Sequence, residues 1–529
     1  MAPIIRTCSA ALALLATPAV AATPADLSAY VRARAADAGG ASAVAAAGYA
    51  EALAAAPDDA VVAIRAYRAA LRVGDLALAR RARLVLEAHD VAPADAALFA
   101  IAEAAARGDK PGAITAIRRL SGGALAFLGP PLTAWAAFPE ASPALTTLAA
   151  DTLDRRYGLD AGALIALARG QTAAGLAVLR AQLGDGSGAL DLRLAAARLL
   201  VARGDRAAAL GLLAGDTPAL VAARAAIDQP VRPGLAFGLA RALGRLAEDL
   251  ESAQAGTLGI AAARALLILE PDNDRARLLL AQALGAENEP ERALAALDRV
   301  AANGPYAALA ASARVDLLSA AGRQAAALAA ARRLASMPGA GSGEAQRLGD
   351  LLAAAGQDGE AAAAYGEAIA RAGAEASWTL YLQQGGALDR AGRWAEAEPL
   401  LARAVQLAPD QPIALNYLAY ARLEHGGDVG AARVLLERAA RLKPDDASIQ
   451  DSLAWAYYLG GDAARALPLL ERAAIGEPSN GTISEHLGDV YWQLGRRFEA
   501  RYAWTAAAQL ASSDDAARIA AKLEQGPAR

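Results

Sequence analysis

The chain has 529 residues, of which 55% are hydrophobic and only 5% aromatic, and its formal net charge at pH 7 is −4. Much of the apolar content is alanine, a strong helix former, while the β-branched and aromatic residues that favour strands are sparse. Length and composition therefore favour a long helical repeat array over several globular domains or an extensive sheet. The near-neutral charge, without any lysine- or arginine-dense run, argues against a nucleic-acid binder.

The first 21 residues have the pattern of a secretory signal peptide. Arg6 precedes a short apolar run, and the small residues Ala19 and Ala21 mark an expected cleavage site after Ala21. The run is too short for a stable membrane anchor. The single cysteine, Cys8, lies inside this segment and lacks the small and apolar residues that precede a lipid-attachment site. We therefore expect an exported, soluble, periplasmic protein with no lipid anchor and no later membrane span.

A period of about 34 residues runs through most of the remaining chain. A small alanine recurs at spacings of 34, 34, 36, 35, 34 and 34 residues: Ala293, Ala327, Ala361, Ala397, Ala432, Ala466 and Ala500. Glycines that end a first helix precede several of them: Gly356, Gly392, Gly427, Gly461 and Gly495. Prolines close the units: Pro305, Pro409, Pro444 and Pro478. The pattern resembles the tetratricopeptide repeat, a helix, a turn and an antiparallel helix, and implies an all-α solenoid, a right-handed superhelix of such hairpins.

In chain order, helical repeats are predicted over residues 22–118, degenerate repeats over 236–341 and well-formed repeats over 342–511. Between the first two segments, the proline- and glycine-containing stretch 119–235 loosens the register. It predicts a hinge or irregular hairpins that separate two superhelical segments. The last segment, 512–529, opens with serine and aspartate caps and carries few apolar residues, which is typical of a polar capping helix followed by a tail.

No motif in the sequence points to catalysis. His89, His425 and His486 each stand alone, without a second ligand or base at metal-binding or catalytic spacing. Phosphate-binding, dinucleotide-binding and nucleophile-elbow motifs do not occur. Hydrolysis would need a site made only of carboxylates, such as Glu485 with Asp489. We therefore expect no enzyme activity, no cofactor and no metal.

An aromatic and acidic strip is predicted on the C-terminal repeats. Positions 5, 9 and 12 of a first helix lie four and three residues apart and share one face, which lines the concave surface of tetratricopeptide repeats. On three successive first helices these positions are Asn416, Tyr420, Asp451, Trp455, Tyr458, Glu485, Asp489 and Trp492. Aromatics are favoured binding hot spots, and carboxylates beside them select basic or hydrogen-bond-donating partners. The alternative is that the tryptophans pack on neighbouring helices and the carboxylates are merely solvated.

Other residues of this region are explained by packing or solvation. Three aromatics occupy helix-contact positions: Tyr457, Tyr491 and Trp504. Arg496, Arg497 and Arg501 are expected to lie on a solvated face or to pair with Glu499 or Asp489, and not to form a site.

Three motifs in the same region resemble a narrower, proteobacterial family of exported repeat proteins. They are Leu-Asn-x-Leu-Ala-Tyr at 415–420, Asp-Ser-Leu-Ala-Trp-x-Tyr-Tyr at 451–458 and His-Leu-Gly-Asp-x-Tyr-Trp at 486–492. That family includes outer-membrane lipoproteins that bind a periplasmic carboxyl-terminal processing protease and bring it to cell-wall hydrolase substrates. The resemblance implies an adaptor. The acylated cysteine of those lipoproteins is missing here, and Ala419 and Ala454 stand where the motif has glycine.

These observations together predict a non-enzymatic periplasmic adaptor or scaffold. It would bind a protein partner of the cell envelope through the strip, such as a carboxyl-terminal processing protease or its substrates, and no nucleic acid. The alternative is a structural subunit of an envelope assembly for the cell wall, the outer membrane or polysaccharide export, held by broad surfaces on the convex face or the N-terminal repeats. The sequence leaves the partner's identity and the oligomeric state open.

Overall fold

The computed structural model describes residues 24–140, 152–183, 187–253 and 255–527. Within these ranges the chain is helical and no β-strand occurs, so the predicted all-α class is confirmed. The predicted signal peptide lies outside the described residues. None of the described helices is long and apolar enough to cross a membrane.

The chain forms two compact units, the first ending at Ala330 and the second beginning at Ala331. This division falls inside the predicted segment 236–341 and not in the loosened stretch 119–235. That stretch instead contains the short helices α8 (Gly129–Ala136), α12 (Arg206–Leu212) and α13 (Pro218–Ala225) beside longer ones, within the first unit.

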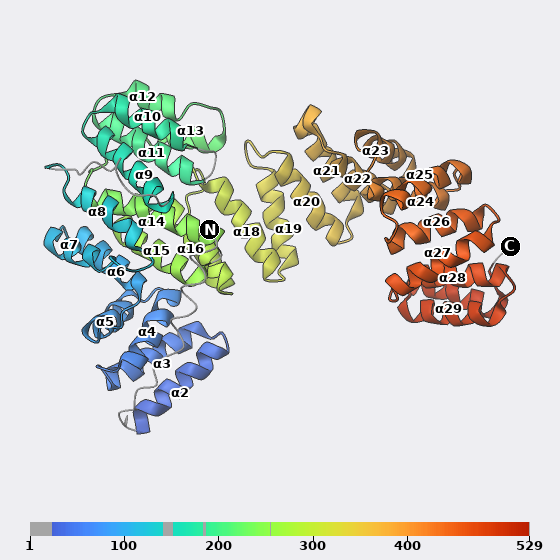
Figure 1. Ribbon diagram of the computed structural model, residues 1–529, viewed down its shortest axis with the longest axis horizontal. Coiled ribbons are helices and arrows are strands. Elements are labelled where there is room, and N and C mark those ends of the chain that lie inside the picture. Colours follow the sequence, from blue (N-terminus) through green and yellow to red (C-terminus); the bar gives the residue numbers. More distant parts are fainter. Residues whose placement is uncertain (1–23, 141–151, 184–186, 254, 528–529) are drawn as a thin grey trace. The chain divides into compact units, whose positions relative to one another are not determined.

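The first unit consists of helix pairs and single short helices (Figure 1). Their bounds are α2 (Pro24–Ala38), α3 (Ser42–Ala55), α4 (Ala60–Val73), α5 (Leu76–Ala88), α6 (Ala94–Ala106), α7 (Lys110–Arg118), η2 (Ala126–Leu128), α8 (Gly129–Ala136), α9 (Thr152–Ala168), α10 (Thr172–Gln182), α11 (Ser187–Ala202), α12 (Arg206–Leu212), α13 (Pro218–Ala225), α14 (Leu235–Ser252), α15 (Gly256–Leu269), α16 (Asp274–Ala286), α17 (Pro290–Leu297) and α18 (Ala307–Ala320).

The second unit is a run of hairpins in chain order. After α19 (Gln324–Ala335), which contains the division, come α20 (Ser342–Ala354), α21 (Asp358–Ala372), η4 (Gly373–Glu375), α22 (Trp378–Arg390), α23 (Trp394–Leu407), α24 (Pro412–Glu424), α25 (Val429–Leu442), α26 (Ala447–Leu459), α27 (Ala463–Gly476), α28 (Gly481–Gln493), α29 (Arg497–Leu510) and α30 (Ser513–Gln525).

The alanines of the 34-residue period are fully buried within the hairpins. All seven have 0% exposed surface: Ala293, Ala327, Ala361, Ala397, Ala432, Ala466 and Ala500. A small side chain at this position lets two antiparallel helices approach, and any larger one would force them apart. The packing therefore confirms the predicted solenoid of helix hairpins.

Six of these seven hairpins turn on a glycine in the left-handed backbone region, which residues with a Cβ avoid, and the hairpin of Ala293 turns on Asn288, with φ of 58°. Four predicted turn glycines have φ between 69° and 85°: Gly356, Gly392, Gly461 and Gly495. The prediction at Gly427 is wrong, because Gly426 has this conformation, with φ of 73°. The helix α24 ends at Glu424, and in these repeats the left-handed glycine follows two positions after the last helical residue.

Prolines close the second helices of three repeats. Pro409, Pro444 and Pro478 each lie two residues after the last residue of α23, α25 and α27. Proline has no N–H to continue a helix, so the chain leaves the helix there and enters the next repeat.

The first unit departs from a linear array, because its early helices fold back onto later ones. Helix α15 packs against α4 and α6 as well as against its sequence neighbours (Figure 1). Arg264 of α15 donates hydrogen bonds to the carbonyl oxygens of Leu71 and Arg72 at the end of α4. Ser42, the first residue of α3, hydrogen-bonds to Glu289. A linear solenoid contacts only adjacent repeats, so these long-range contacts make the first unit a closed body.

Substituting Gly488 by alanine is expected to lower the free energy of unfolding by about 1–3 kcal/mol. An added Cβ would lie 2.4 Å from the indole ring of Trp504. Ala419 and Ala454 tolerate a Cβ at the same repeat position because leucines face them. The control Gly359→Ala has no atom within 4 Å of its new Cβ and should be neutral or stabilising by up to about 1 kcal/mol. Urea denaturation followed by circular dichroism compares the variants, and equal midpoints would contradict this packing.

Candidate functional site

The eight residues of the predicted strip come from α24, α26 and α28, the first helices of three consecutive repeats, which contact one another in order. We use "the strip" for these eight residues. Five are partly exposed: Asn416, Tyr420, Trp455, Tyr458 and Trp492. Three are buried: Asp451 at 6%, Glu485 at 4% and Asp489 at 2% exposed surface. The alternative of solvated carboxylates is therefore wrong, since each carboxylate has an intramolecular partner.

His486, which the sequence left without a partner, organises the middle of the strip. Its Nδ1 lies 2.8 Å from Oδ1 of Asp451, and both side chains are buried. Its ring stacks on the indole of Trp455, with centroids 4.0 Å apart and planes 13° apart. Tyr458 stacks on the same indole at 4.9 Å. Trp455 is thus fixed between repeats by packing, and part of its ring face is already covered.

The other two histidines also pair with an aspartate about one repeat earlier in the sequence. His89 Nε2 lies 2.9 Å from Asp58, and His425 Nε2 lies 2.7 Å from Asp389. His425 in addition stacks on Trp394, with centroids 4.4 Å apart. The prediction that the histidines stand alone is wrong in this respect, because one repeat period places residues side by side on adjacent helices. Within the described residues no group of three or more His, Cys, Asp or Glu side chains could hold a metal ion.

The acidic end of the strip is covered by the chain's own last helix, α30. Lys522 places Nζ 2.6 Å from Glu485 and 2.5 Å from Asp489, and Arg518 also pairs with Glu485. Burial raises the pKa of Asp489 above its ordinary value, against the opposing effect of Lys522 and of the hydrogen bond from Trp504. Two carboxylates four residues apart thus meet two cations four residues apart, and this part of the strip is not free for a partner.

Trp492 belongs to the same covered end. It lies beside Trp504, at 5.3 Å between centroids, and packs in a cluster with Ile519 and Leu523 of α30. The guanidinium of Arg497 stands 3.6 Å above its ring. The helix α30 therefore has an apolar face as well as the predicted polar one, and its Ser512 cap accepts a hydrogen bond from the backbone of Asp515.

The open part of the strip is formed by Asn416, Tyr420, Trp455 and Tyr458. Burial, and then the nearby carboxylate of Glu424, raise the pKa of Tyr420 above its ordinary value, so its hydroxyl stays a neutral donor. Among the described residues, Oδ1 of Asn416 is buried and has no hydrogen-bond partner. This surface therefore offers partly exposed aromatic rings to a partner, while the Tyr420 hydroxyl already donates to the carboxylate of Glu424.

The remaining C-terminal predictions concern packing and surface. Tyr457 and Tyr491 occupy equivalent positions, and each hydroxyl donates to a glutamate twenty residues earlier. Arg496 pairs with Glu499 at 3.0 Å, as expected, and Arg501 is exposed.

Three exposed apolar side chains on the second helices were not predicted. Ile475 of α27 is 81% exposed, and Phe498 and Tyr502 of α29 are 82% and 75% exposed. The last two lie four residues apart, so they share one face of α29. The only sequence signal for this pair is that both aromatics fall outside the helix-contact positions of the repeat.

Comparison with known proteins supports the repeat assignment. Residues 390–456, from the end of α22 to α26, match the model of the tetratricopeptide repeat family. No curated protein matches the sequence.

Solved structures give partial matches. A thermophilic tetratricopeptide protein of Thermus thermophilus is 21% identical over 35% of this chain and 99% of its own, with a TM-score of 0.31. The C-terminal part of a tetratricopeptide protein of Cytophaga hutchinsonii is 18% identical over 45% and 97%, with a TM-score of 0.34. YrrB, described as having an unusual peptide-binding site, is 18% identical over 42% and 95%, with a TM-score of 0.25. Scores of this size add nothing to the fold that the chain's own hairpins show.

Proposed function

We propose that the chain is a non-enzymatic adaptor or scaffold that binds a protein partner along the first-helix face of its C-terminal repeats. The observation that carries the proposal is the open part of the strip, where aromatic rings are held in place but left partly exposed on adjacent helices. Rigid aromatics lose little conformational entropy on binding, which makes them efficient contact residues. The tetratricopeptide match at residues 390–456 supports an interaction role, since these repeats serve protein recognition.

The helix α30 indicates what kind of segment this face accepts. It contributes cations at Arg518 and Lys522 to the buried carboxylates and apolar side chains at Ile519 and Leu523 to Trp492. A partner helix that continues along α26 and α24 would meet Trp455 and the two tyrosines of the open strip. We propose an amphipathic helix with basic residues as the preferred partner segment, bound as an apolar face in a groove.

The proposal extends to location and partner class. The N-terminal pattern supports export to the periplasm, and the motifs at 451–458 and 486–492 support a role beside a carboxyl-terminal processing protease or its substrates. The missing lipid-attachment cysteine sets the chain apart from the lipoprotein adaptors of that family. We propose attachment to the envelope through the protein partner alone.

A structural subunit of an envelope assembly is the second candidate. The exposed pair Phe498 and Tyr502 favours it, because isolated exposed aromatics are normal but two large ones on one face of α29 form a candidate contact surface. In that case the contacts would lie on the second-helix face and not on the strip.

Partner capture distinguishes the two surfaces. Three chains serve as bait for partners in periplasmic extract. They are the mature chain, the strip variant Tyr420→Ala/Tyr458→Ala and the control variant Phe498→Ala/Tyr502→Ala. We expect the strip variant to bind its partner about tenfold or more weakly than the parent chain, as for other aromatic hot spots. The control should bind the partner like the parent chain. Urea midpoints close to that of the parent chain establish that both variants fold. If the strip variant still binds the partner and the control does not, the partner binds the second-helix face and not the strip.

A further inference from the structure

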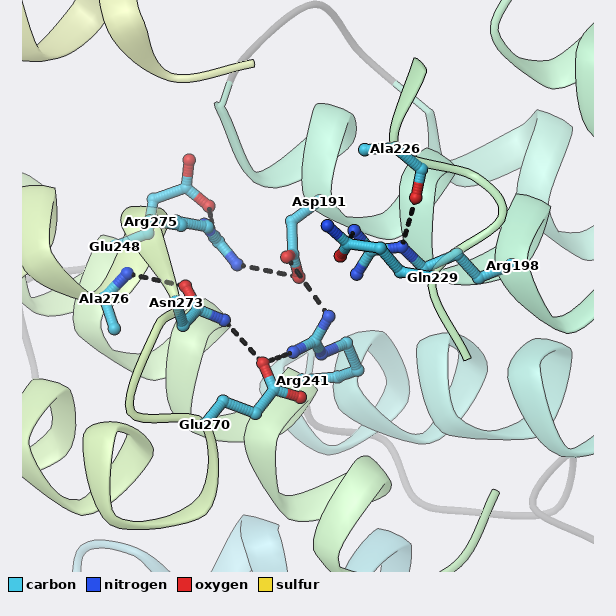
Figure 2. A network of polar contacts seen from close by, with 10 residues as sticks. All are labelled: Asp191, Arg198, Ala226, Gln229, Arg241, Glu248, Glu270, Asn273, Arg275 and Ala276. Carbon is cyan, nitrogen blue, oxygen red and sulfur yellow. Dashed lines mark hydrogen bonds and ion pairs between the residues drawn. The ribbon is translucent and has the colours of Figure 1, made fainter. Parts of the chain in front are cut away.

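A groove of about 660 Å³ opens in the first unit, away from the strip. It is lined by α11, α13 and α14 and by the turns that follow α15 and α17. A volume in this range is usual for the binding site of a small molecule or a short peptide. Figure 2 shows a polar network that includes lining residues of the groove, in which Arg241 lies between Asp191 and Glu270.

The carboxylates of this groove are already satisfied. Asp191 accepts from Arg241 at 3.3 Å and from Arg275 at 3.1 Å. Glu270 accepts from Arg241 at 2.5 Å and from Asn273 at 2.6 Å (Figure 2). The two remaining acids in the lining, Asp272 and Asp274, both pair with Arg277.

The groups left without a partner in the groove are hydrogen-bond donors. Tyr306 is only 5% exposed. Its hydroxyl is buried and has no hydrogen-bond partner among the described residues. Arg198 donates through Nε to the carbonyl oxygen of Ala226 at 3.1 Å and through Nη2 to Gln229. Within the described part of the chain, Nη1 of Arg198 makes no hydrogen bond. Arg232, also in the lining, makes no ion pair with the described residues. A buried donor without an acceptor is costly, so the groove lacks an acceptor.

Electrostatics agrees with this conclusion. Burial, and then the charge of Arg241, lower the pKa of Arg198 against the opposing effect of Asp191 and Glu270. Burial, and then the carboxylate of Asp191, raise the pKa of Tyr306 above its ordinary value, so its hydroxyl stays protonated and can only gain by donating.

We propose that this groove binds the carboxylate of an organic acid with an apolar body, held by Arg198 and the Tyr306 hydroxyl. A carboxylate supplies acceptors in the planar geometry that a guanidinium fork matches. The apolar wall formed by Leu194, Val231 and Phe237 suits the rest of the ligand. A phosphate dianion fits less well, because it would face four neighbouring carboxylates. The carboxylate comes either from a peptide C-terminus or from a free fatty acid.

Calorimetric titration of the full chain at low salt tests the proposal. The probes are the tripeptide acetyl-Ala-Leu-Phe, the same peptide with an amidated terminus, octanoate and inorganic phosphate. We expect saturable binding of at least one carboxylate probe, with the amidated peptide and phosphate at least about tenfold weaker. Whether the tripeptide or octanoate binds more tightly identifies the source of the carboxylate.

Two variants and a control connect binding to the groove. Arg198→Gln should lower the affinity for the carboxylate probe by about tenfold or more. Tyr306→Phe, which removes one oxygen only, should lower it by about threefold or more. Arg180→Gln, an exposed arginine of α10 outside the groove, should bind like the parent chain. No saturable binding of either carboxylate, tighter binding of phosphate, or unchanged affinity in both groove variants would overturn the proposal.

Discussion

Replacing Trp504 by alanine is expected to lower the free energy of unfolding by about 3–5 kcal/mol, the largest effect of any single core truncation in the second unit. The indole has 0% exposed surface and fills the space left by Gly488 on the facing helix. Its Nε1 donates to Oδ1 of Asp489 at 2.9 Å. Truncation therefore creates a cavity and also removes a hydrogen bond from a buried carboxylate.

Phe498 provides a matched control on the same helix, α29. It is 82% exposed, so Phe498→Ala should change the free energy of unfolding by no more than about 0.5 kcal/mol. Urea denaturation gives both values, and amide hydrogen exchange shows whether the loss is confined to α28, α29 and α30, as expected when repeats contact only their neighbours. Similar effects for both residues would mean that Trp504 is not the core of the last hairpin.

The repeat fold could be predicted from the sequence because its main determinant is local. A buried alanine once per period, a glycine at the turn and a proline after the second helix each act within a few residues of their own position. The error at Gly427 arose because two adjacent glycines satisfy the period equally well. Only the last helical residue, Glu424, decides between them, and helix ends are the least certain feature of a sequence pattern.

The closure of the first unit could not be predicted in this way. Contacts such as Arg264 with the end of α4 join residues almost two hundred positions apart, and no period links them. The groove of the first unit could not be predicted from the sequence either. Arg198 and Tyr306 come from different helix pairs, so their shared surface exists only once α11, α14 and α18 have packed.

The sequence predicted which helices carry the strip, but not which side chains would contact it. Helical spacing is a property of a single helix, so it predicts which positions of one helix share a face, and the eight residues lie on the contacting helices α24, α26 and α28. The pairing of His486 with Asp451 could have been found, because 35 residues separate them and one period brings equivalent helices together. The cover by α30 could not, because a terminal helix has no following repeat to fix its direction. Its only signal was the spacing of Arg518 and Lys522, which matches that of Glu485 and Asp489.

Lys522→Met is expected to lower the free energy of unfolding by about 3 kcal/mol at neutral pH, because it leaves two nearly buried carboxylates without their shared cation. Lys522 has 14% of its side chain exposed, against 5% for Glu485 and 3% for Asp489. Lys443→Met is the control. Lys443 is 64% exposed in its pair with Asp446, and such surface pairs contribute no more than about 1 kcal/mol.

The size of the Lys522 effect should depend on pH. Burial already raises the pKa of Asp489 in the folded chain, and removing the lysine raises it further. A carboxyl whose pKa is higher in the folded than in the unfolded chain binds its proton more readily when folded. Its contribution to stability is therefore present at low pH and is lost as pH rises through the folded pKa. The gap between variant and parent should narrow as pH falls from about 7.5 towards about 5.

Asp489→Asn in the Lys522→Met background separates charge from packing. The amide keeps an oxygen that can accept from Trp504 but carries no charge, so the double variant should recover part of the lost stability at neutral pH and lose most of the pH dependence. Urea denaturation across this pH range measures all three chains. A gap that stays constant with pH would show that Lys522 stabilises α30 by packing its stem. It would also show that the acidic end of the strip does not need a cation, from α30 or from a partner.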